Sequence, residues 1–338
     1  ACNQACLDHA FKNIRASCLV NPRACHEVEL NYIATSAPKR IGVIGAGPAG
    51  LAFSTVAAER GHDVTLYDAA EEIGGQFNMA KKIPGKEEFY ETLRYFKRKI
   101  ELSGVKLELG KERNAQELLD AKFDHIILAT GVHPRMPTID GIGHPKVLNY
   151  IEVLRDGRAV GNRVAVIGAG GIGFDICEYL AHPEGHPQAN IQEYLKEWGV
   201  DPNNAVRGGI EGVEANHLPS SRELIMMQRS SGKLGAGLGK TTGWIHRSSL
   251  KNKKVRMVSE VEYLKIDDHG IHIQVDGKPE VVEVDNVIIC AGQLSNRDLL
   301  ESLEKGSASV HLIGGADVAS ELDAKGAINQ GSRLAASL

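Results

Sequence analysis

The sequence has 338 residues, which suggests two or three domains at roughly 100–200 residues each. Its 39 basic and 43 acidic residues give a net charge of −4 without a block of like charge, so we expect neither nucleic acid nor an anionic membrane as a partner. No apolar run approaches the ~18 residues of a membrane span, and no basic segment leads into an apolar one at the N-terminus, so we expect a cytoplasmic protein.

The first 37 residues form a separate segment that is rich in cysteine. Four of the six cysteines lie in the first 25 residues, and no strand–helix alternation is visible before Pro38. Cys2, Cys6 and Cys18 are spaced C-x3-C-x11-C, which is neither the paired spacing of zinc sites nor a redox C-x-x-C motif. An iron–sulfur cubane needs four thiolates, so we expect these three to be ligands of a cluster whose fourth ligand is missing.

An internal repeat organises the rest of the chain. Residues 41–51 (IGVIGAGPAGL) are echoed by residues 164–174 (VAVIGAGGIGF), and residues 124–131 are echoed by residues 285–292. Each copy runs from a β-branched strand through a glycine turn, an alternation with helices that predicts parallel sheets in an α/β fold. Because the chain returns to a strand and glycine turn at 310–317, we expect two nested Rossmann-like dinucleotide-binding domains.

Gly45, Gly47 and Gly50 form a G-x-G-x-x-G fingerprint directly after the first predicted strand. The first glycine permits a tight turn, the second lets the backbone approach a pyrophosphate, and the third lets the helix pack closely on the strand. The helix that begins at Pro48 and Ala49 would direct its free N–H groups at the phosphates.

Asp68 ends the next predicted strand, 18 residues after Gly50. A carboxylate there accepts hydrogen bonds from ribose hydroxyls and repels a 2′-phosphate. Strand, glycine turn, helix, strand and acid together predict a dinucleotide site. The alternative is a glycine turn that serves packing alone.

The second fingerprint repeats this spacing at Gly168, Gly170 and Gly173. Its next strand is predicted at residues 223–228 and ends in the amide of Gln228 rather than in a carboxylate. The residues that follow include Arg229, Ser230 and Lys233. A guanidinium and hydroxyls in place of an acid accommodate a 2′-phosphate, so NADPH is favoured over NADH. Solvated surface charges at Arg229 and Lys233 are the alternative.

The two pairs of echoes are offset by 123 and 161 residues, and the difference of 38 predicts an insertion at about residues 181–221 of the second copy. Apolar residues with helical spacing in this insertion predict a packing face, namely Ile191, Tyr194, Leu195 and Trp198. The glycine-rich residues 232–244 are either a mobile loop or a loop that folds over the nicotinamide with Trp244 as a lid. We interpret His246 as structural, and Cys177 and Cys290 as core. No general base is assigned, because hydride transfer to a flavin needs stacking.

Four motifs in order resemble the FAD domain of flavoprotein reductases with two dinucleotide domains. They are the first fingerprint and residues 72–77 (EIGGQF), 129–131 (ATG) and 314–317 (GGAD). The resemblance implies contacts to FAD from Gly75, Gln76, Gly131, Gly315 and Asp317. A helix at about residues 324–334 would direct its positive end at the flavin ring.

The whole chain resembles a narrower family, the bacterial NADPH-dependent 2,4-dienoyl-CoA reductases, which are iron–sulfur flavoproteins of the old-yellow-enzyme and trimethylamine-dehydrogenase group. The resemblance runs through residues 1–27 and the motifs GAGPAGLAF, EIGGQF, IPGKEEFYETLRYF, GAGGIGFD, GLGKTTGWIHR and VHLIGGADVASELDA. It implies that Asp68, Gln76 and Lys86 contact FAD, and that Arg229 and Ser230 bind the 2′-phosphate of NADP.

The family also implies a [4Fe–4S] cluster with the pattern C-x2-C-x3-C-x11-C. Cys2, Cys6 and Cys18 match its last three positions; the first falls before Ala1, and Cys25 lies outside the pattern. We therefore expect a cysteine-rich segment at 1–37, an FAD domain at 38–150 plus 293–338 and an NADP domain at 151–292.

The family's N-terminal (β/α)8 barrel, which holds FMN and reduces dienoyl-CoA in fatty acid β-oxidation, has no counterpart in this sequence. The chain resembles the electron-input half, in which NADPH reduces FAD and electrons pass through the cluster to FMN in the barrel. Two alternatives stay open: an amine-dehydrogenase-like domain that holds ADP, and a nucleotide-binding scaffold without redox activity. Arg229 and the intact second fingerprint favour the reductase.

Overall fold

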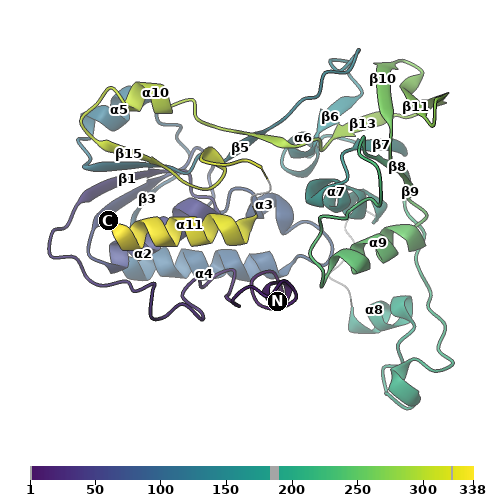
Figure 1. The fold of residues 1–338 in the computed structure, drawn as a ribbon, viewed down its shortest axis with the longest axis horizontal. Coiled ribbons are helices and arrows are strands. Elements are labelled where there is room, and N and C mark those ends of the chain that lie inside the picture. The colour runs from purple at the N-terminus through teal and green to yellow at the C-terminus, as the bar shows by residue number, and fades with distance from the viewer. Residues whose placement is uncertain (1, 183–189, 321–322) are drawn as a thin grey trace.

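The computed structural model describes residues 2–182, 190–320 and 323–338, which form two lobes (Figure 1). Each lobe is built on a five-stranded parallel sheet, so the predicted pair of nested Rossmann-like folds is confirmed. The first sheet, in the order β15-β4-β1-β2-β3, comprises β1 (Arg40–Ile44), β2 (Asp63–Tyr67), β3 (Lys106–Glu108), β4 (His125–Leu128) and β15 (Ser309–Leu312). The second, in the order β6-β13-β7-β8-β9, comprises β6 (Val147–Asn149), β7 (Arg163–Ile167), β8 (Glu223–Met227), β9 (Arg256–Val258) and β13 (Asn286–Ile289).

Both sheets are covered on both faces, which explains why their central strands are apolar throughout. In the first lobe, α2 (Pro48–Glu59), α4 (Glu88–Ser103) and α11 (Ala324–Ser337) pack on one face, and α5 (Ala115–Asp120) and α10 (Leu300–Leu303) pack on the other. The short α3 (Phe77–Ala80) precedes α4.

The second lobe uses different layers on its two faces. One face carries α6 (Tyr150–Leu154), α7 (Gly171–Ala181) and α9 (Gly243–Asn252). The other carries an antiparallel sheet of β10 (Glu262–Asp267), β11 (Gly270–Val275) and β12 (Lys278–Val282). Cys177 and Cys290 are buried in the core of this lobe, as expected.

The two lobes are joined by two crossings of the chain. β5 (Val132–Pro134) leads out of the first lobe and β14 (Gln293–Ser295) leads back, and the two pair as an antiparallel ribbon (Figure 1). β6 pairs with β13 of the second sheet, although it precedes the boundary expected at residue 151. The second lobe therefore begins soon after β5. A strand belongs to the sheet in which it finds a hydrogen-bonded partner, and the sequence repeat does not show that partner.

Helix α8 (Ile191–Trp198) corrects the interpretation of the insertion. The helix forms as its spacing predicted, but no residue in it is buried, and the Ile191 side chain is 71% exposed. Figure 1 shows α8 below α9, and its Glu197 is 3.4 Å from the Nζ atom of Lys253 at the end of α9. Its aromatic contacts are local, since Trp198 meets Tyr194 and His217 at ring-centroid distances of 6.2 and 6.0 Å. The predicted packing face was wrong, because periodicity marks an apolar stripe and not what covers it.

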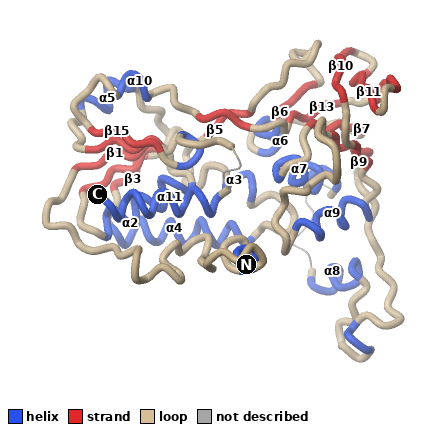
Figure 2. Tube along the Cα trace, viewed as in Figure 1, coloured by secondary structure: helices blue, strands red, loops and turns tan. Residues whose placement is uncertain are grey.

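The N-terminal segment is mostly irregular, with one short helix, α1 (Leu7–Ala10) (Figure 2). It contacts both lobes. Asp8 accepts hydrogen bonds from the backbone N–H and the hydroxyl of Thr241 in the second lobe, at 2.9 and 2.8 Å. His9 lies 3.2 Å from the Nζ atom of Lys325 in α11 of the first lobe. Within the described residues, no helix has the length and apolar character needed to span a bilayer.

Candidate nucleotide-binding sites

The passage from β1 into α2 requires glycine at two positions. Gly45 has a φ of +109°, and a Cβ atom on it would overlap the carbonyl oxygen of Ala129 in the neighbouring β4–β5 connection. A Cβ atom on Gly50 would overlap the carbonyl oxygen of Gly45 itself. The start of α2 is therefore pressed against the end of β1, and its first N–H groups point out of the carboxyl edge of the sheet.

Gly47 faces the EIGGQF segment rather than a side chain. A Cβ atom on Gly75 would lie 3.0 Å from the Cα atom of Gly47, and the N–H of Gly74 donates to the carbonyl of Ala46 at 2.8 Å. Gln76 follows directly and precedes α3. Two backbone segments without side chains thus meet at the N-terminus of α2, as a cradle for a pyrophosphate requires.

Asp68 lies just past the end of β2 and organises the same turn. Its Oδ2 atom accepts a hydrogen bond from the Ala46 N–H at 2.6 Å, and its Oδ1 atom accepts one from the Ala70 N–H at 2.8 Å. Each carboxylate oxygen has a second lone pair that is free for a ribose hydroxyl. The geometry places the carboxylate beside the glycine turn, where the sequence placed it.

The GGAD segment completes the first site from the far end of the chain. A Cβ atom on Gly315 would lie 3.0 Å from the carbonyl carbon of Gly131, so the ATG and GGAD turns touch. Asp317 accepts a hydrogen bond from the Gln330 side chain at 2.6 Å, and Gln330 in turn accepts one from the Gly314 N–H at 2.7 Å. Gln330 anchors both ends of this turn to α11, a role that the sequence analysis did not identify.

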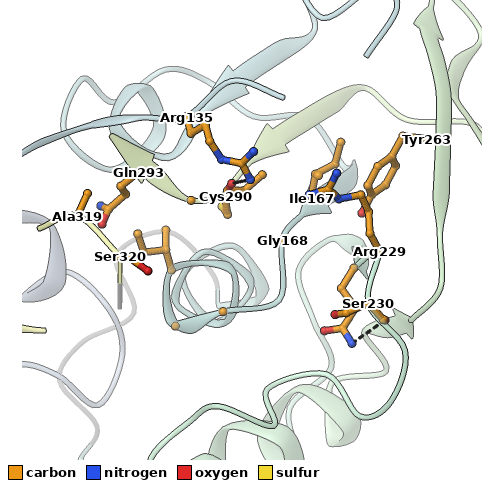
Figure 3. Close-up of a pocket in the computed structure, with 16 residues that line it drawn as sticks. Arg135, Ile167, Gly168, Arg229, Ser230, Tyr263, Cys290, Gln293, Ala319 and Ser320 are labelled. Carbon is orange, nitrogen blue, oxygen red and sulfur yellow. Dashed lines mark hydrogen bonds between the residues drawn. The ribbon is translucent and has the colours of Figure 1, made fainter. Parts of the chain in front are cut away.

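The second fingerprint opens into a pocket of about 570 Å³ (Figure 3). Gly168 repeats the geometry of its counterpart, with a φ of +114° and a Cβ position that overlaps the carbonyl of Cys290. Gly170 lines the pocket, and a Cβ atom on it would meet no atom within 4 Å. This space is available to a ligand. Ala319 and Ser320 of the first lobe also line the pocket, so it lies where the lobes meet.

The residues that follow β8 form one rim of this pocket. Arg229 and Ser230 line it, whereas Lys233 is exposed and is not among the lining residues. The Gln228 side-chain N–H2 donates to the carbonyls of Ser230 and Gly232 at 3.1 and 3.2 Å. The Gln228 amide therefore stabilises the loop after β8. A carboxylate at the same position would repel a 2′-phosphate.

Two lining residues lie outside the fingerprint and were missed by the sequence analysis. Arg135, directly after β5, donates to the carbonyl of Ala291, and its Nε atom would be 3.1 Å from a Cβ atom on Gly292. Tyr263 comes from β10 of the antiparallel sheet. No local motif marks either residue, because each reaches the pocket through tertiary contacts.

Lys86 lies at the junction of the lobes. Its Nζ atom is 2.5 Å from the Oδ1 atom of Asp175 in α7, the helix of the second fingerprint. Trp244, at the start of α9, is 55% exposed and is not among the residues that line the pocket. The part of the loop that precedes it is bonded to α1 instead, through Thr241 and Asp8.

A buried acid lies behind the second fingerprint. Glu178 in α7 is 4% exposed, and burial raises its pKa to about 7 against the opposing hydrogen bond from Ser249 at 3.1 Å. His246 in α9 lies 4.0 Å from the same carboxyl group, and burial lowers the pKa of this histidine. These contacts agree with a structural role for His246.

The cysteines of the N-terminal segment do not form a metal site in this structure. Cys6 and Cys25 are exposed, and Cys2 packs against the core of the first lobe. Across residues 2–182, 190–320 and 323–338, no three His, Cys, Asp or Glu side chains are gathered to hold a metal ion. Within the described residues, Cys2, Cys6 and Cys18 are therefore not gathered as three ligands of a cluster.

Two parallel sheets with nested connectivity and a glycine fingerprint at each carboxyl edge define a two-dinucleotide flavoprotein fold. The profile of the pyridine nucleotide-disulphide oxidoreductases matches residues 39–322. The chain belongs to this family, whose fold holds FAD and a nicotinamide nucleotide.

Among curated proteins, the chain is 30% identical to a metal reductase of Desulforamulus reducens over 93% of its own length and 46% of the relative's. It is 28% identical to an NADH oxidase of Thermoanaerobacter brockii over 94% and 44% of the two lengths. The chain thus spans about half the length of these relatives.

Solved structures extend the likeness. A 2-naphthoyl-CoA reductase has a TM-score of 0.84 at 26% identity, and the likeness covers 100% of this chain and 46% of that one. Histamine dehydrogenase from Rhizobium sp. 4-9 has a TM-score of 0.76 at 19% identity over 100% and 47% of the two chains. The thioredoxin reductase of T. acidophilum has a TM-score of 0.59 at 15% identity over 89% and 98%. The last two show the fold alone.

Proposed function

We propose that this chain is the electron-input module of a larger reductase, in which NADPH bound in the second lobe reduces FAD bound in the first. The observation that carries the proposal is the pocket at the lobe junction. Its rim combines Arg229 with the amide of Gln228, its floor is the glycine turn at Gly168, and Ala319 and Ser320 of the first lobe close its other end.

The residues present fit both nucleotides. In the first lobe, the backbones of Gly47 and Gly75 form the pyrophosphate cradle, and Asp68 has acceptor capacity for a ribose. In the second lobe, the space beside Gly170 fits a pyrophosphate, and the Arg229 guanidinium suits a 2′-phosphate. FAD held by these residues would supply a hydride acceptor that can pass its electrons on singly.

The Lys86–Asp175 ion pair joins the two lobes beside the second fingerprint. It links α7 to the first lobe at the junction that a hydride would have to cross. Orientation is what this chain contributes, since hydride transfer needs stacked rings rather than an acid–base pair.

The onward acceptor would be FMN in an upstream barrel, and the substrate an unsaturated CoA thioester such as a 2,4-dienoyl-CoA of fatty acid β-oxidation. The twofold greater length of the relatives and the likeness to 2-naphthoyl-CoA reductase support this proposal. No step is assigned to an iron–sulfur cluster, because the described cysteines do not form its site. Iron and sulfide assays on the purified chain test this point: a stoichiometric, air-stable cluster would contradict it and would make Cys25 a ligand.

Anaerobic mixing of the FAD-loaded chain with NADPH tests the proposal. We expect bleaching of the flavin absorbance, slower bleaching with NADH, and steady turnover with ferricyanide but not with a 2,4-dienoyl-CoA. Turnover of the dienoyl-CoA would show that the chain is more than an input module. A colourless chain that releases ADP on denaturation, and does not bind FAD, would favour the amine-dehydrogenase-like alternative.

A further inference from the structure

Tyr263 carries a hydroxyl group whose hydrogen-bonding capacity is unused. The residue lines the pocket, yet its Oη atom is buried and has no hydrogen-bond partner among the described residues. A buried hydroxyl without a partner costs free energy, so we expect its hydrogen bond to be made to water or to a ligand. Burial also raises the pKa of Tyr263 far above its usual range, which keeps the phenol protonated and able to donate.

The phenol and the Arg229 guanidinium converge on one end of the pocket. Figure 3 shows the two side chains next to each other, and the charge of Arg229 acts on the phenol directly. No hydrogen bond joins the two groups within the described residues. Both can donate a hydrogen bond, so both are suited to the same anionic acceptor. The residue that follows β8 is Gln228, so no carboxylate at that position competes for these donors.

Backbone contacts fix this pairing. The Val261 N–H donates to the Gln228 carbonyl at 3.0 Å, and the Glu260 N–H donates to the Ser230 carbonyl at 3.2 Å. The strand that carries Tyr263 is thus bonded to the loop that carries Arg229. The β10–β11 register also shifts between Tyr263 and Lys265, and bulges of this kind re-aim a side chain next to a binding site.

We propose that Tyr263 is a specificity-determining residue whose hydroxyl donates a hydrogen bond to the 2′-phosphate that Arg229 binds. The proposal rests on the proposed use of NADPH. It adds a residue that recognises the 2′-phosphate from the antiparallel sheet, outside the glycine fingerprint. A nucleotide with a free 2′-hydroxyl would satisfy the phenol less well, because a neutral hydroxyl is a weaker acceptor than a phosphate oxygen.

Calorimetric titration of the full chain with 2′,5′-ADP and with 5′-AMP tests the proposal. Tyr263→Phe keeps the ring and removes the hydroxyl, so we expect roughly tenfold weaker binding of 2′,5′-ADP and unchanged binding of 5′-AMP. Arg229→Ala should show the same selectivity with a larger loss. Tyr95→Phe, a half-exposed tyrosine in α4 of the first lobe, is the matched control and should change neither affinity. In turnover, Tyr263→Phe should raise KM for NADPH without lowering kcat.

The possible failures are distinguishable. If Arg229→Ala weakens 2′,5′-ADP selectively and Tyr263→Phe does not, the assignment of Tyr263 is wrong and the proposed use of NADPH stands. If Tyr263→Phe weakens both ligands equally, the phenol contacts the adenosine and the assignment is wrong. If the wild-type chain binds both ligands equally and Arg229→Ala changes nothing, the use of NADPH and the role of Tyr263 are both overturned.

Discussion

The two glycine fingerprints share one backbone and differ in the chemistry at the end of the next strand. Gly45 and Gly168 have φ values of +109° and +114°, and a side chain on either would overlap a carbonyl of the neighbouring strand connection. Past β2 stands the carboxylate of Asp68, whereas past β8 stands the amide of Gln228. The glycines therefore set the shape of each turn, and the side chain after the next strand is a carboxylate in the first lobe and a neutral amide in the second.

The same comparison shows that each strand-end side chain also supports its own loop. Asp68 accepts hydrogen bonds from the N–H groups of Ala46 and Ala70, while Gln228 donates to the carbonyls of Ser230 and Gly232. The Asp68 carboxylate is satisfied by backbone N–H groups, whereas the Gln228 side chain donates to backbone carbonyls. The loops around these two residues therefore differ in backbone conformation. Under the proposed function, selectivity for the nucleotide would therefore depend on loop conformation as well as on charge.

The largest expected effect is on folding stability, and it distinguishes a glycine needed for packing, Gly173, from one that leaves space for a ligand, Gly170. Gly173→Ala places a Cβ atom on the carbonyl oxygen of Gly168 and should destabilise the second lobe by ~3 kcal/mol or more, as overpacking against backbone does. Gly170→Ala meets no atom within 4 Å, so the thermal midpoint should stay the same while NADPH affinity falls. Calorimetric unfolding and nucleotide titration of both variants check this; equal stability of the two would contradict it.

Arg229→Ala tests the difference in charge between the two strand ends. The variant should lose a charge-assisted contact of ~1.5–3 kcal/mol with the 2′-phosphate, so KM for NADPH should rise roughly 10- to 100-fold while KM for NADH changes little. Lys233→Ala is the matched control, because Lys233 is exposed and outside the pocket lining. An equal rise in KM for NADPH and NADH would show that Arg229 does not bind the 2′-phosphate.

The fingerprint helices also differ in buried charge, which predicts a pH dependence. Helix α2 buries no acid, whereas α7 buries Glu178 with a pKa of about 7. A raised pKa means that the folded state binds the proton more tightly than the unfolded state, whose carboxyl titrates near its usual value. The contribution of this carboxyl group to folding stability is therefore fully present below about pH 4.5 and is lost as the pH rises through 7, by on the order of 3 kcal/mol.

Several charged groups surround that carboxyl group and set the size of the effect. Lys253 opposes the shift, and Asp175 and Glu197 add to it. His182 and His246 each lie 4.0 Å from it. Glu178→Gln should remove the pH-dependent loss while it keeps an acceptor for Ser249, and denaturant unfolding between pH 5 and 8 measures it. A wild-type slope that persists in the variant would assign the titration to another group.

The smallest expected effect concerns the contact between the N-terminal segment and the second lobe. Thr241→Val removes the hydroxyl that donates to Asp8 and leaves the backbone donor, so the segment should loosen by about 1 kcal/mol or less. Faster proteolytic removal of the first residues, with unchanged flavin binding, is the expected readout. Thr242→Val is the matched control, because the Thr242 hydroxyl makes no hydrogen bond within the described residues. Equal cleavage rates in both variants would contradict the contact.

Much of the fold could be predicted from the sequence because its signals are local. A glycine that must adopt a positive φ, or that lies under a carbonyl, is visible in a three-residue spacing, and the alternation of strand and helix is visible over about thirty residues. Gly45 and Asp68 could therefore be placed at one edge of a sheet before any tertiary contact was known. Gln228 could likewise be placed at the end of the strand that follows the second fingerprint.

Other features depend on which surfaces meet, and they were decided only by the tertiary structure. The apolar stripe of α8 has helical spacing, yet none of the residues of α8 is buried. β6 joins the second sheet because it pairs with β13. The phenol of Tyr263 reaches the pocket from a sheet that belongs to no nucleotide motif. Periodicity fixes which face of an element is apolar and which turn the backbone can make, but partners far apart in the chain are chosen by packing, which no local spacing encodes.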